Sequence, residues 1–244
     1  MRLKTLIQYH LWDYKRAIMI FYGIIITLFI IFAIVNLISP QRINVSVGGL
    51  EIASIIFIFV AGVASFTEIF YFSLINGVSR KTQFLAFTGS MFSLAAIMAA
   101  VDSVFGFISL RLAEVQNLFA VFYGTKYQGV ASLQLYVDRF LWMLVIYTLI
   151  AITGYLISMI YYHSNKTTKL IVSILPPVFF IIVLPLIDSM TSFKIFASLR
   201  GLLLRMLGLY NNVNPYIAIF STLVAVAIVS FFNYLLISKA EVKN

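Results

Sequence analysis

Two acidic residues, Glu68 and Asp102, interrupt long apolar stretches of the sequence. A charged side chain at the centre of a membrane helix costs about 2.5–3.5 kcal/mol on insertion scales, so such residues usually bind substrate, relay protons or pair with a polar group. Glu68 comes eight residues before Asn76, about 12 Å along a helix, which predicts a position near one boundary of its stretch. Small residues that permit close helix packing surround Asp102, namely Ala99, Ala100, Ser103 and Gly106. Both acids are candidate intramembrane polar sites. A structural hydrogen bond or salt bridge explains Glu68 equally well, and helix packing or a local break explains Asp102 as readily as a substrate contact does.

The sequence lacks the motifs of the common catalytic centres. It contains no G-x-x-x-x-G-K-[ST] phosphate loop, no G-x-S-x-G elbow and no H-E-x-x-H pair. Cysteine is absent, and the two histidines, His10 and His163, fall at predicted membrane edges, where interfacial packing explains such rings. We therefore expect no catalytic residue, no metal ligand and no cofactor in this chain.

The composition is that of a membrane protein. Of the 244 residues, 62% are hydrophobic and 10% are charged, whereas an average soluble domain has about 25% charged residues. A soluble fold could not cover that much apolar surface, so lipid must serve as the solvent. The net charge of +9 is explained by Lys and Arg beside membrane spans, which orient the chain and attract anionic lipid. We expect contact with lipid and no binding to nucleic acid.

Six apolar stretches approach the roughly 20 residues that a helix needs to cross the hydrocarbon core. They are residues 17–38, 52–76, 84–110, 140–162, 170–187 and 215–237. The predicted fold class is therefore all-α, a polytopic membrane protein with one six-helix transmembrane domain over residues 17–238 and a tail at 239–244. Three prolines in the fifth stretch, Pro176, Pro177 and Pro185, predict a kink or a break there.

Basic residues cluster in every second connection between the predicted spans. If the N-terminus is inside, the cytoplasmic pieces are residues 1–16, 77–83, 163–169 and 238–244, and these 37 residues hold ten of the 17 Lys and Arg. Short cytoplasmic loops carry an excess of these residues, so the bias predicts that both termini are cytoplasmic.

Three segments outside the spans are amphipathic or unusually long. In residues 1–16, apolar side chains recur at helical spacing opposite basic ones, which predicts an amphipathic helix in the membrane interface. The external segments 111–139 and 188–213 are longer than a connection requires. The second is amphipathic and either lies on the outer surface or dips back into the protein as a re-entrant hairpin.

The stretch from Phe66 to Ser90 reads FTEIFYFSLINGVSRKTQFLAFTGS and resembles the region between the second and third spans of ABC-2 type transporter permeases. Small Gram-positive members of that family often have a Glu in the second span and an N-G-V-S-R-K-T turn that enters the third. The matching residues are Glu68, Asn76, Gly77, Val78, Ser79, Arg80, Lys81 and Thr82. The remainder agrees in layout, with an amphipathic N-terminal helix, six spans and a long external segment before the last span.

The resemblance implies the membrane subunit of an ATP-binding cassette exporter of type V-like architecture in a bacterial plasma membrane. A short cytoplasmic helix in the region 76–82 would press on a separate ABC ATPase subunit, which binds the ATP and Mg²⁺, and Glu68 would tie this coupling region to neighbouring helices. Such permeases act with a second permease chain, identical or related, and with two ATPase copies. The favoured cargo is an amphipathic peptide or toxin, as in bacteriocin self-protection and phenol-soluble modulin export.

Other interpretations of these residues stay open. The basic run is also consistent with a turn that only fixes topology, although Asn76 and Gly77 are suited to end one helix and Ser79 to cap the next. An ion- or proton-coupled secondary transporter would titrate Glu68 and Asp102 and would need no ATPase, but no inverted repeat is visible. An intramembrane enzyme would need a polar cluster within the spans, which two isolated acids do not supply.

Overall fold

Helices form all the regular structure in the part of the chain that the computed structural model describes. The described residues are 3–38, 49–112, 117–127, 133–190, 194–210 and 213–239. In chain order, the elements are α1 (Leu3–Ile38), α2 (Gly49–Ile75), α3 (Arg80–Leu112), α4 (Leu118–Tyr123), the 3-10 turn η1 (Gly124–Tyr127), α5 (Leu133–His163), α6 (Lys166–Val178), the π-helical turn η2 (Phe179–Val183), α7 (Leu184–Met190), α8 (Lys194–Met206) and α9 (Pro215–Ser238). Six helical stretches are long and apolar enough to cross a membrane. For the described residues, this confirms an all-α chain with six helices of the length and apolarity that a membrane span requires.

Several helices extend beyond the spans that hydropathy predicts. α3 begins at Arg80 rather than at residue 84, and α5 begins at Leu133 rather than at residue 140. The polar residues in the end turns of a helix continue its backbone hydrogen bonds. Hydropathy does not detect these turns, because their side chains are not apolar. The predicted external segment 111–139 therefore holds the start of α5 as well as α4 and η1.

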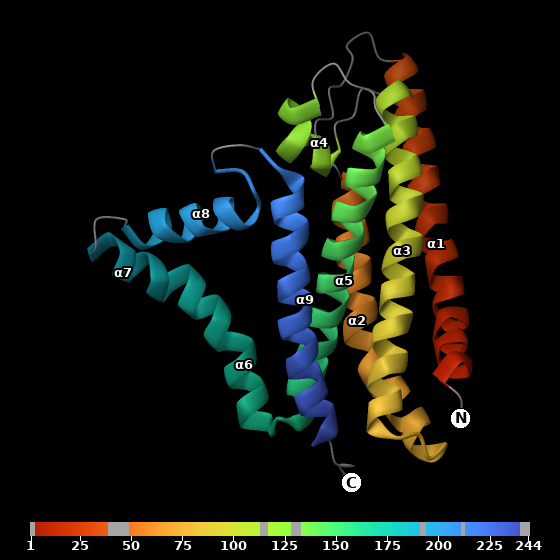
Figure 1. Cartoon of the computed structure of the whole chain (residues 1–244), viewed down its shortest axis with the longest axis vertical. Coiled ribbons are helices and arrows are strands. Elements are labelled where there is room, and N and C mark those ends of the chain that lie inside the picture. Colours follow the sequence, from red (N-terminus) through yellow and green to blue (C-terminus); the bar gives the residue numbers. More distant parts are fainter. Residues whose placement is uncertain are drawn as a thin grey trace.

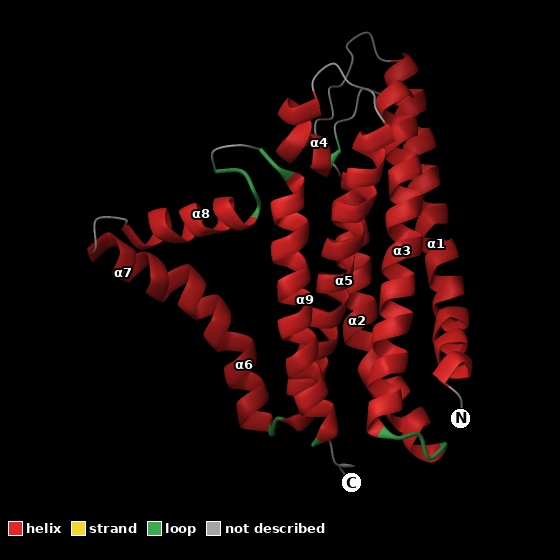
Figure 2. Ribbon diagram, in the orientation of Figure 1, coloured by secondary structure: helices red, strands yellow, loops and turns green. Residues whose placement is uncertain are grey.

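The central helix of the bundle is α5, which packs against α2, α3 and α9. α1 packs against α3 on one side of this group. On the other side, α6 and α7 lean away from α9, and α8 crosses between them and the start of α9 (Figures 1 and 2). The bundle that positions polar groups is therefore formed by α1, α2, α3, α5 and α9.

Glycines allow α2 and α5 to pack closely. A Cβ added at Gly62 would lie 2.2 Å from the carbonyl oxygen of Ala151, and one added at Gly154 would lie 2.6 Å from that of Phe59. No side chain fits at either position without moving backbone. The close contact aligns α2 and α5 along their length, which brings their first turns side by side.

One stripe of α1 faces the bundle. Its residues are spaced by four and comprise Leu6, His10, Tyr14, Ile18 and Tyr22. Three of them make polar contacts. His10 Nδ1 lies 3.2 Å from Ser90 Oγ, the Tyr14 hydroxyl bonds the Ser65 hydroxyl, and Tyr22 bonds a group on α3. A four-residue spacing stays on one side of an α-helix, so the stripe fixes the rotation of α1 about its axis.

The predicted amphipathic segment 1–16 is not a separate helix. α1 runs without a break from Leu3 to Ile38. No glycine or proline stands between residues 3 and 22, so nothing in the backbone ends the helix at the predicted boundary. The apolar side of this segment packs against the bundle through Leu6 and His10, and its position in the membrane interface stays a prediction.

The fifth membrane helix is irregular where its prolines predict a kink. The π-helical turn η2 separates α6 from α7 and follows Pro176 and Pro177, which supply no backbone N–H. Pro185 stands in the first turn of α7. Most side chains of α6 and η2 are exposed in the single chain, which leaves a long apolar surface on this helix.

α8 is fixed at both ends. Asp188 of α7 accepts backbone N–H groups at the start of α8, including that of Ile195 at 2.7 Å. At the other end, the Tyr123 hydroxyl donates to the Leu207 carbonyl at 2.8 Å. The predicted external segment 188–213 thus contains a helix held between α7 and the bundle, and its depth relative to a membrane stays a prediction.

The N-terminal end of α1, the α2–α3 turn and the C-terminal end of α9 lie at one end of the bundle (Figure 1). An even number of crossings requires this arrangement. The described parts of three pieces that we predict to be cytoplasmic, 1–16, 77–83 and 238–244, therefore start or end on one side of the molecule. Their cytoplasmic location stays a prediction.

Candidate functional site

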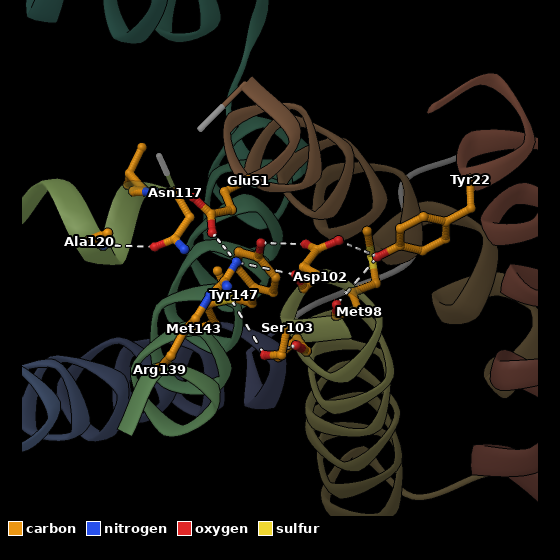
Figure 3. A network of polar contacts seen from close by, with 12 residues as sticks. Tyr22, Glu51, Met98, Asp102, Ser103, Asn117, Ala120, Arg139, Met143 and Tyr147 are labelled. Carbon is orange, nitrogen blue, oxygen red and sulfur yellow. Dashed lines mark hydrogen bonds and ion pairs between the residues drawn. The ribbon is translucent and has the colours of Figure 1, made fainter. Parts of the chain in front are cut away.

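Five polar side chains from four helices meet inside the bundle (Figure 3). Two of them come from the first two turns of α2 and α5, which lie at the end of the bundle opposite the start of α1 (Figure 1). This buried polar cluster consists of Tyr22 of α1, Glu51 of α2, Asp102 of α3, and Arg139 and Tyr147 of α5. All five are buried, and Asp102 is 0% and Arg139 2% exposed. A buried charge is stable only when it is paired and hydrogen-bonded, so the bonds within the cluster determine its chemistry.

Arg139 and Glu51 form a buried ion pair. Arg139 Nη2 lies 2.8 Å from Glu51 Oε1 and also donates to the backbone carbonyl of Asp102 at 3.3 Å. The second oxygen of Glu51 accepts the backbone N–H of Leu118, at the start of α4. The pair therefore joins α2 to α5 and fastens α4 to the end of the bundle.

Gly106 of α3 provides the space that the guanidinium occupies. A Cβ added at Gly106 would lie 1.8 Å from Arg139 Nη2 and 2.0 Å from Nη1. No residue with a side chain fits here unless Arg139 moves. Of the small residues around Asp102, from which we predicted close packing, Gly106 thus accommodates a cation.

Asp102 is held by two tyrosines instead of by the guanidinium. Tyr147 donates to Oδ2 at 2.6 Å, and Tyr22 donates to Oδ1 at 2.9 Å (Figure 3). The Tyr22 hydroxyl also lies 3.3 Å from the carbonyl oxygen of Met98, one helical turn before Asp102. The cluster thus contains two carboxylates and one guanidinium. The guanidinium forms its ion pair with the Glu51 carboxylate.

A second polar group surrounds Asp138, which precedes Arg139 in α5. Its carboxylate accepts hydrogen bonds from the hydroxyls of Tyr127 at 2.5 Å and Tyr216 at 2.8 Å. The Lys126 ammonium lies over both rings, 5.6 Å from the centroid of Tyr127 and 5.0 Å from that of Tyr216. Burial and the neighbouring carboxylate raise the pKa of the Tyr127 phenol, so this group stays a proton donor. The group ties η1 and α9 to the start of α5.

The α2–α3 turn has the caps that we predicted. It consists of Asn76, Gly77, Val78 and Ser79. Gly77 has φ +60°, a left-handed conformation that ends α2 as glycine commonly does. The Ser79 hydroxyl accepts the N–H of Thr82 at 3.3 Å, and the Ser79 carbonyl accepts that of Gln83 at 2.9 Å, so Ser79 caps α3.

The structure contains no separate coupling helix in the region 76–82, contrary to what the resemblance implies. Arg80, Lys81 and Thr82 form the first turn of α3 instead. The Ser79 cap starts the helix at once, and no helix-breaking residue follows it before Gly89. The basic residues of the motif therefore belong to a helix that continues into the bundle.

Arg80 connects the α2–α3 turn to a buried aromatic group. Its guanidinium carbon lies 4.6 Å from the ring centroid of Phe70, which is 0% exposed. Phe70 packs against Phe66 of α2 and Tyr162 of α5, with centroids 5.2 and 5.1 Å away. Lys81, in contrast, is exposed. A displacement at the turn would thus act directly on the packing between α2 and α5.

The residues that we predicted from the sequence fall into two separate regions. Asp102 follows Arg80 by 22 positions in α3, about 33 Å along the helix, so the buried polar cluster and the α2–α3 turn are far apart. Glu68 belongs to α2, and its side chain lies outside the described residues. The structure does not join Asp102 to the predicted coupling region.

Sequence reasoning missed the partners of Asp102. Glu51 and Arg139 stand one residue before the predicted second and fourth spans, so they were assigned to external segments. A signal was present, because opposite charges precede two spans that start at the same end of the molecule. Tyr22 and Tyr147 gave no comparable signal among 14 tyrosines.

Among the described residues, no group of three or more His, Cys, Asp or Glu is arranged to hold a metal ion. The chemistry that the two regions offer is ion pairing, hydrogen bonding and proton exchange. The chain matches no protein-family model, no curated protein and no solved structure. The resemblance to ABC-2 type permeases therefore rests on the residues quoted above.

Proposed function

We propose that the chain is the permease subunit of an ATP-binding cassette exporter in a bacterial plasma membrane. The observation that carries the proposal is the link between Arg80 and Phe70, which ties a basic turn to the aromatic packing of the bundle. A turn that only fixed topology would need positive charge but no such link. The turn also lies at the same end of the bundle as both termini, where a cytoplasmic motor would have to dock.

In this proposal, a separate ATPase subunit binds the α2–α3 turn and supplies the work. Its ATP-driven movement would push on the first turn of α3, where Lys81 is exposed for charge pairing. Arg80 would pass the movement to Phe70 and so to the contact of α2 with α5. ATP and Mg²⁺ belong to the partner, and this chain is not itself an enzyme.

A second permease chain, identical or related, would complete the pathway. The long apolar surface of α6 and η2 supports this part of the proposal, because such a surface must be covered by lipid or by another helix. The favoured cargo is an amphipathic peptide or toxin. A pathway between apolar helices would accept the apolar face of such a peptide.

Purification of the chain from native membranes in a mild detergent tests the proposal. We expect an ATPase with a phosphate-binding loop to co-purify and the isolated chain to hydrolyse no ATP. Replacement of Arg80 by Ala should abolish this association, or uncouple ATP hydrolysis from export, while membrane insertion persists. Lys166→Ala is the matched control, since Lys166 is an exposed basic residue and the first residue of α6, which begins at the same end of the bundle (Figure 1). Equal effects of the two substitutions, or a chain that transports without an ATPase, would refute the proposal.

The alternative, an ion- or proton-coupled secondary transporter, receives less support. It requires acids along a transport path, whereas Asp102 is 0% exposed and enclosed by Tyr22 and Tyr147. Glu51, the other acid of the buried polar cluster, is paired with Arg139. Transport by the purified chain alone in liposomes, driven by an ion gradient, would favour this alternative.

A further inference from the structure

The buried polar cluster has an excess of negative charge. Asp102 and Glu51 supply two carboxylates. Arg139 forms its ion pair with Glu51, and Arg139 Nη2 lies 2.8 Å from Glu51 Oε1. Asp138 does not change this balance, because its two oxygens bond Tyr127 and Tyr216. An unpaired buried carboxylate is costly, and a group in that position commonly takes up a proton instead.

The hydrogen bonds around Asp102 suit both protonation states. When Asp102 is ionised, Tyr147 and Tyr22 each donate to one of its oxygens, at 2.6 and 2.9 Å. When Oδ1 carries a proton, that O–H needs an acceptor, and the Tyr22 oxygen is already within reach. The Tyr22 hydroxyl can then donate to the Met98 carbonyl, 3.3 Å away. A phenol has one proton and accepts as well as donates, so Tyr22 serves both states by rotating its O–H bond.

We propose that Asp102 is a proton-binding site inside the bundle, and that the Tyr22 hydroxyl turns from Asp102 to the Met98 carbonyl when the proton binds. A hydronium ion from the surrounding water gives up the proton, so one of its O–H bonds breaks as an O–H bond forms at Asp102 Oδ1. The covalent O–H bond of the Tyr22 phenol stays intact, and only its hydrogen-bond acceptor changes. The charged groups that face Asp102 are Glu51 from α2 and Arg139 from α5, and the titratable hydroxyls are those of Tyr22 from α1 and Tyr147 from α5.

Proton binding would change the hydrogen bonds that attach α1 to α3. Tyr22 is the residue of the α1 stripe that reaches the buried polar cluster, and its bond to an ionised Asp102 is charge-assisted. Protonation replaces this bond by two neutral ones. The site therefore makes the contact between α1 and α3 sensitive to proton release, whatever drives transport.

Infrared spectroscopy of the purified full-length chain in lipid nanodiscs tests this proposal without an ATPase or a cargo, so its outcome is independent of the proposed function. We expect the C=O band of a buried carboxylic acid at low pH, which disappears as the pH rises within the range where the protein stays folded. Asp102→Asn should remove the band at every pH. Asp13→Asn is the control for an exposed acid and should leave the band unchanged.

Tyr22→Phe gives a second test that does not depend on the folding of Asp102→Asn. Because the acid then loses the acceptor of its O–H, the band should change frequency, and the pH at which it disappears should move. A wild-type spectrum without such a band at any pH would overturn the proposal. A band that persists in Asp102→Asn and is lost in Asp138→Asn would also overturn it, as would a band that Tyr22→Phe leaves unchanged.

Discussion

Arg139 and Glu51, 88 positions apart in the sequence, form an ion pair 2.8 Å long in which both side chains are 3% exposed. The pair closes the end of the bundle opposite the termini, because it links α2 to α5 and Glu51 also holds the first N–H of α4. Two further nitrogens of Arg139, Nε and Nη1, have no hydrogen-bond acceptor among the described residues. Glu51 therefore supplies most of the interaction that offsets the cost of burying the guanidinium.

Removal of one member of this pair should destabilise the protein more than removal of both. Arg139→Met leaves the Glu51 carboxylate without its cation, and Glu51→Gln leaves the guanidinium without its anion, so we expect each to cost about 3–5 kcal/mol. The double variant leaves neither charge buried and should cost less than either single change. Thermal unfolding of the three variants in detergent measures the difference. Additive losses would show that the two side chains do not act as a pair.

Gly106 should tolerate no side chain. Because a Cβ would lie 1.8 Å from Arg139 Nη2, Gly106→Ala forces the guanidinium away from Glu51, and we expect a loss of about 1–3 kcal/mol, as for an overpacked core. Gly23→Ala is the matched control, since nothing lies within 4 Å of a Cβ added at Gly23. The control should be neutral or slightly stabilising, because alanine favours helix. Equal melting temperatures for the two variants would contradict the packing described here.

Hydropathy predicted the six long apolar helices, because each membrane span needs its own long apolar stretch and this need does not depend on which helices pack beside it. The same local physics predicted the caps at Gly77 and Ser79 and the irregularity that follows Pro176 and Pro177. These features depend on residues that are close in the sequence. They could therefore be inferred without knowledge of the packing.

The buried polar cluster could be predicted only in part. Asp102 was identifiable because an acid within an apolar stretch is unusual, but its bonds to Tyr22 and Tyr147 depend on how three helices pack. The continuation of residues 3–16 into the long helix α1 could not be predicted for a related reason. An amphipathic pattern distinguishes helical turns that carry polar side chains from turns that are wholly apolar. It does not show where the helix ends.

Asp188 should control the order of α8. Its carboxylate accepts backbone N–H groups at the start of that helix, at 2.7 Å from Ile195 and 3.1 Å from Phe196, as an N-cap does. Asp188→Ala should cost about 0.5–2 kcal/mol and speed hydrogen exchange of these two amides. Ser189→Ala is the control, because the one bond of the Ser189 hydroxyl among the described residues is to the Leu186 carbonyl within its own helix. Unchanged exchange in Asp188→Ala would rule out the capping role.

Gly77 should be replaceable by asparagine but not by alanine. Its φ of +60° lies in the left-handed region, which costs most residues about 1–2 kcal/mol, whereas asparagine adopts it more readily. A Cβ at this position meets nothing within 4 Å, so any loss in Gly77→Ala comes from the backbone alone. We expect Gly77→Ala to unfold at a lower temperature than Gly77→Asn, with α2 fraying at its end. If the turn also binds an ATPase, the association should weaken in the same order, because a frayed turn no longer holds Arg80 over Phe70. A ranking with alanine above asparagine would mean that the left-handed turn does not limit stability at this end of the bundle.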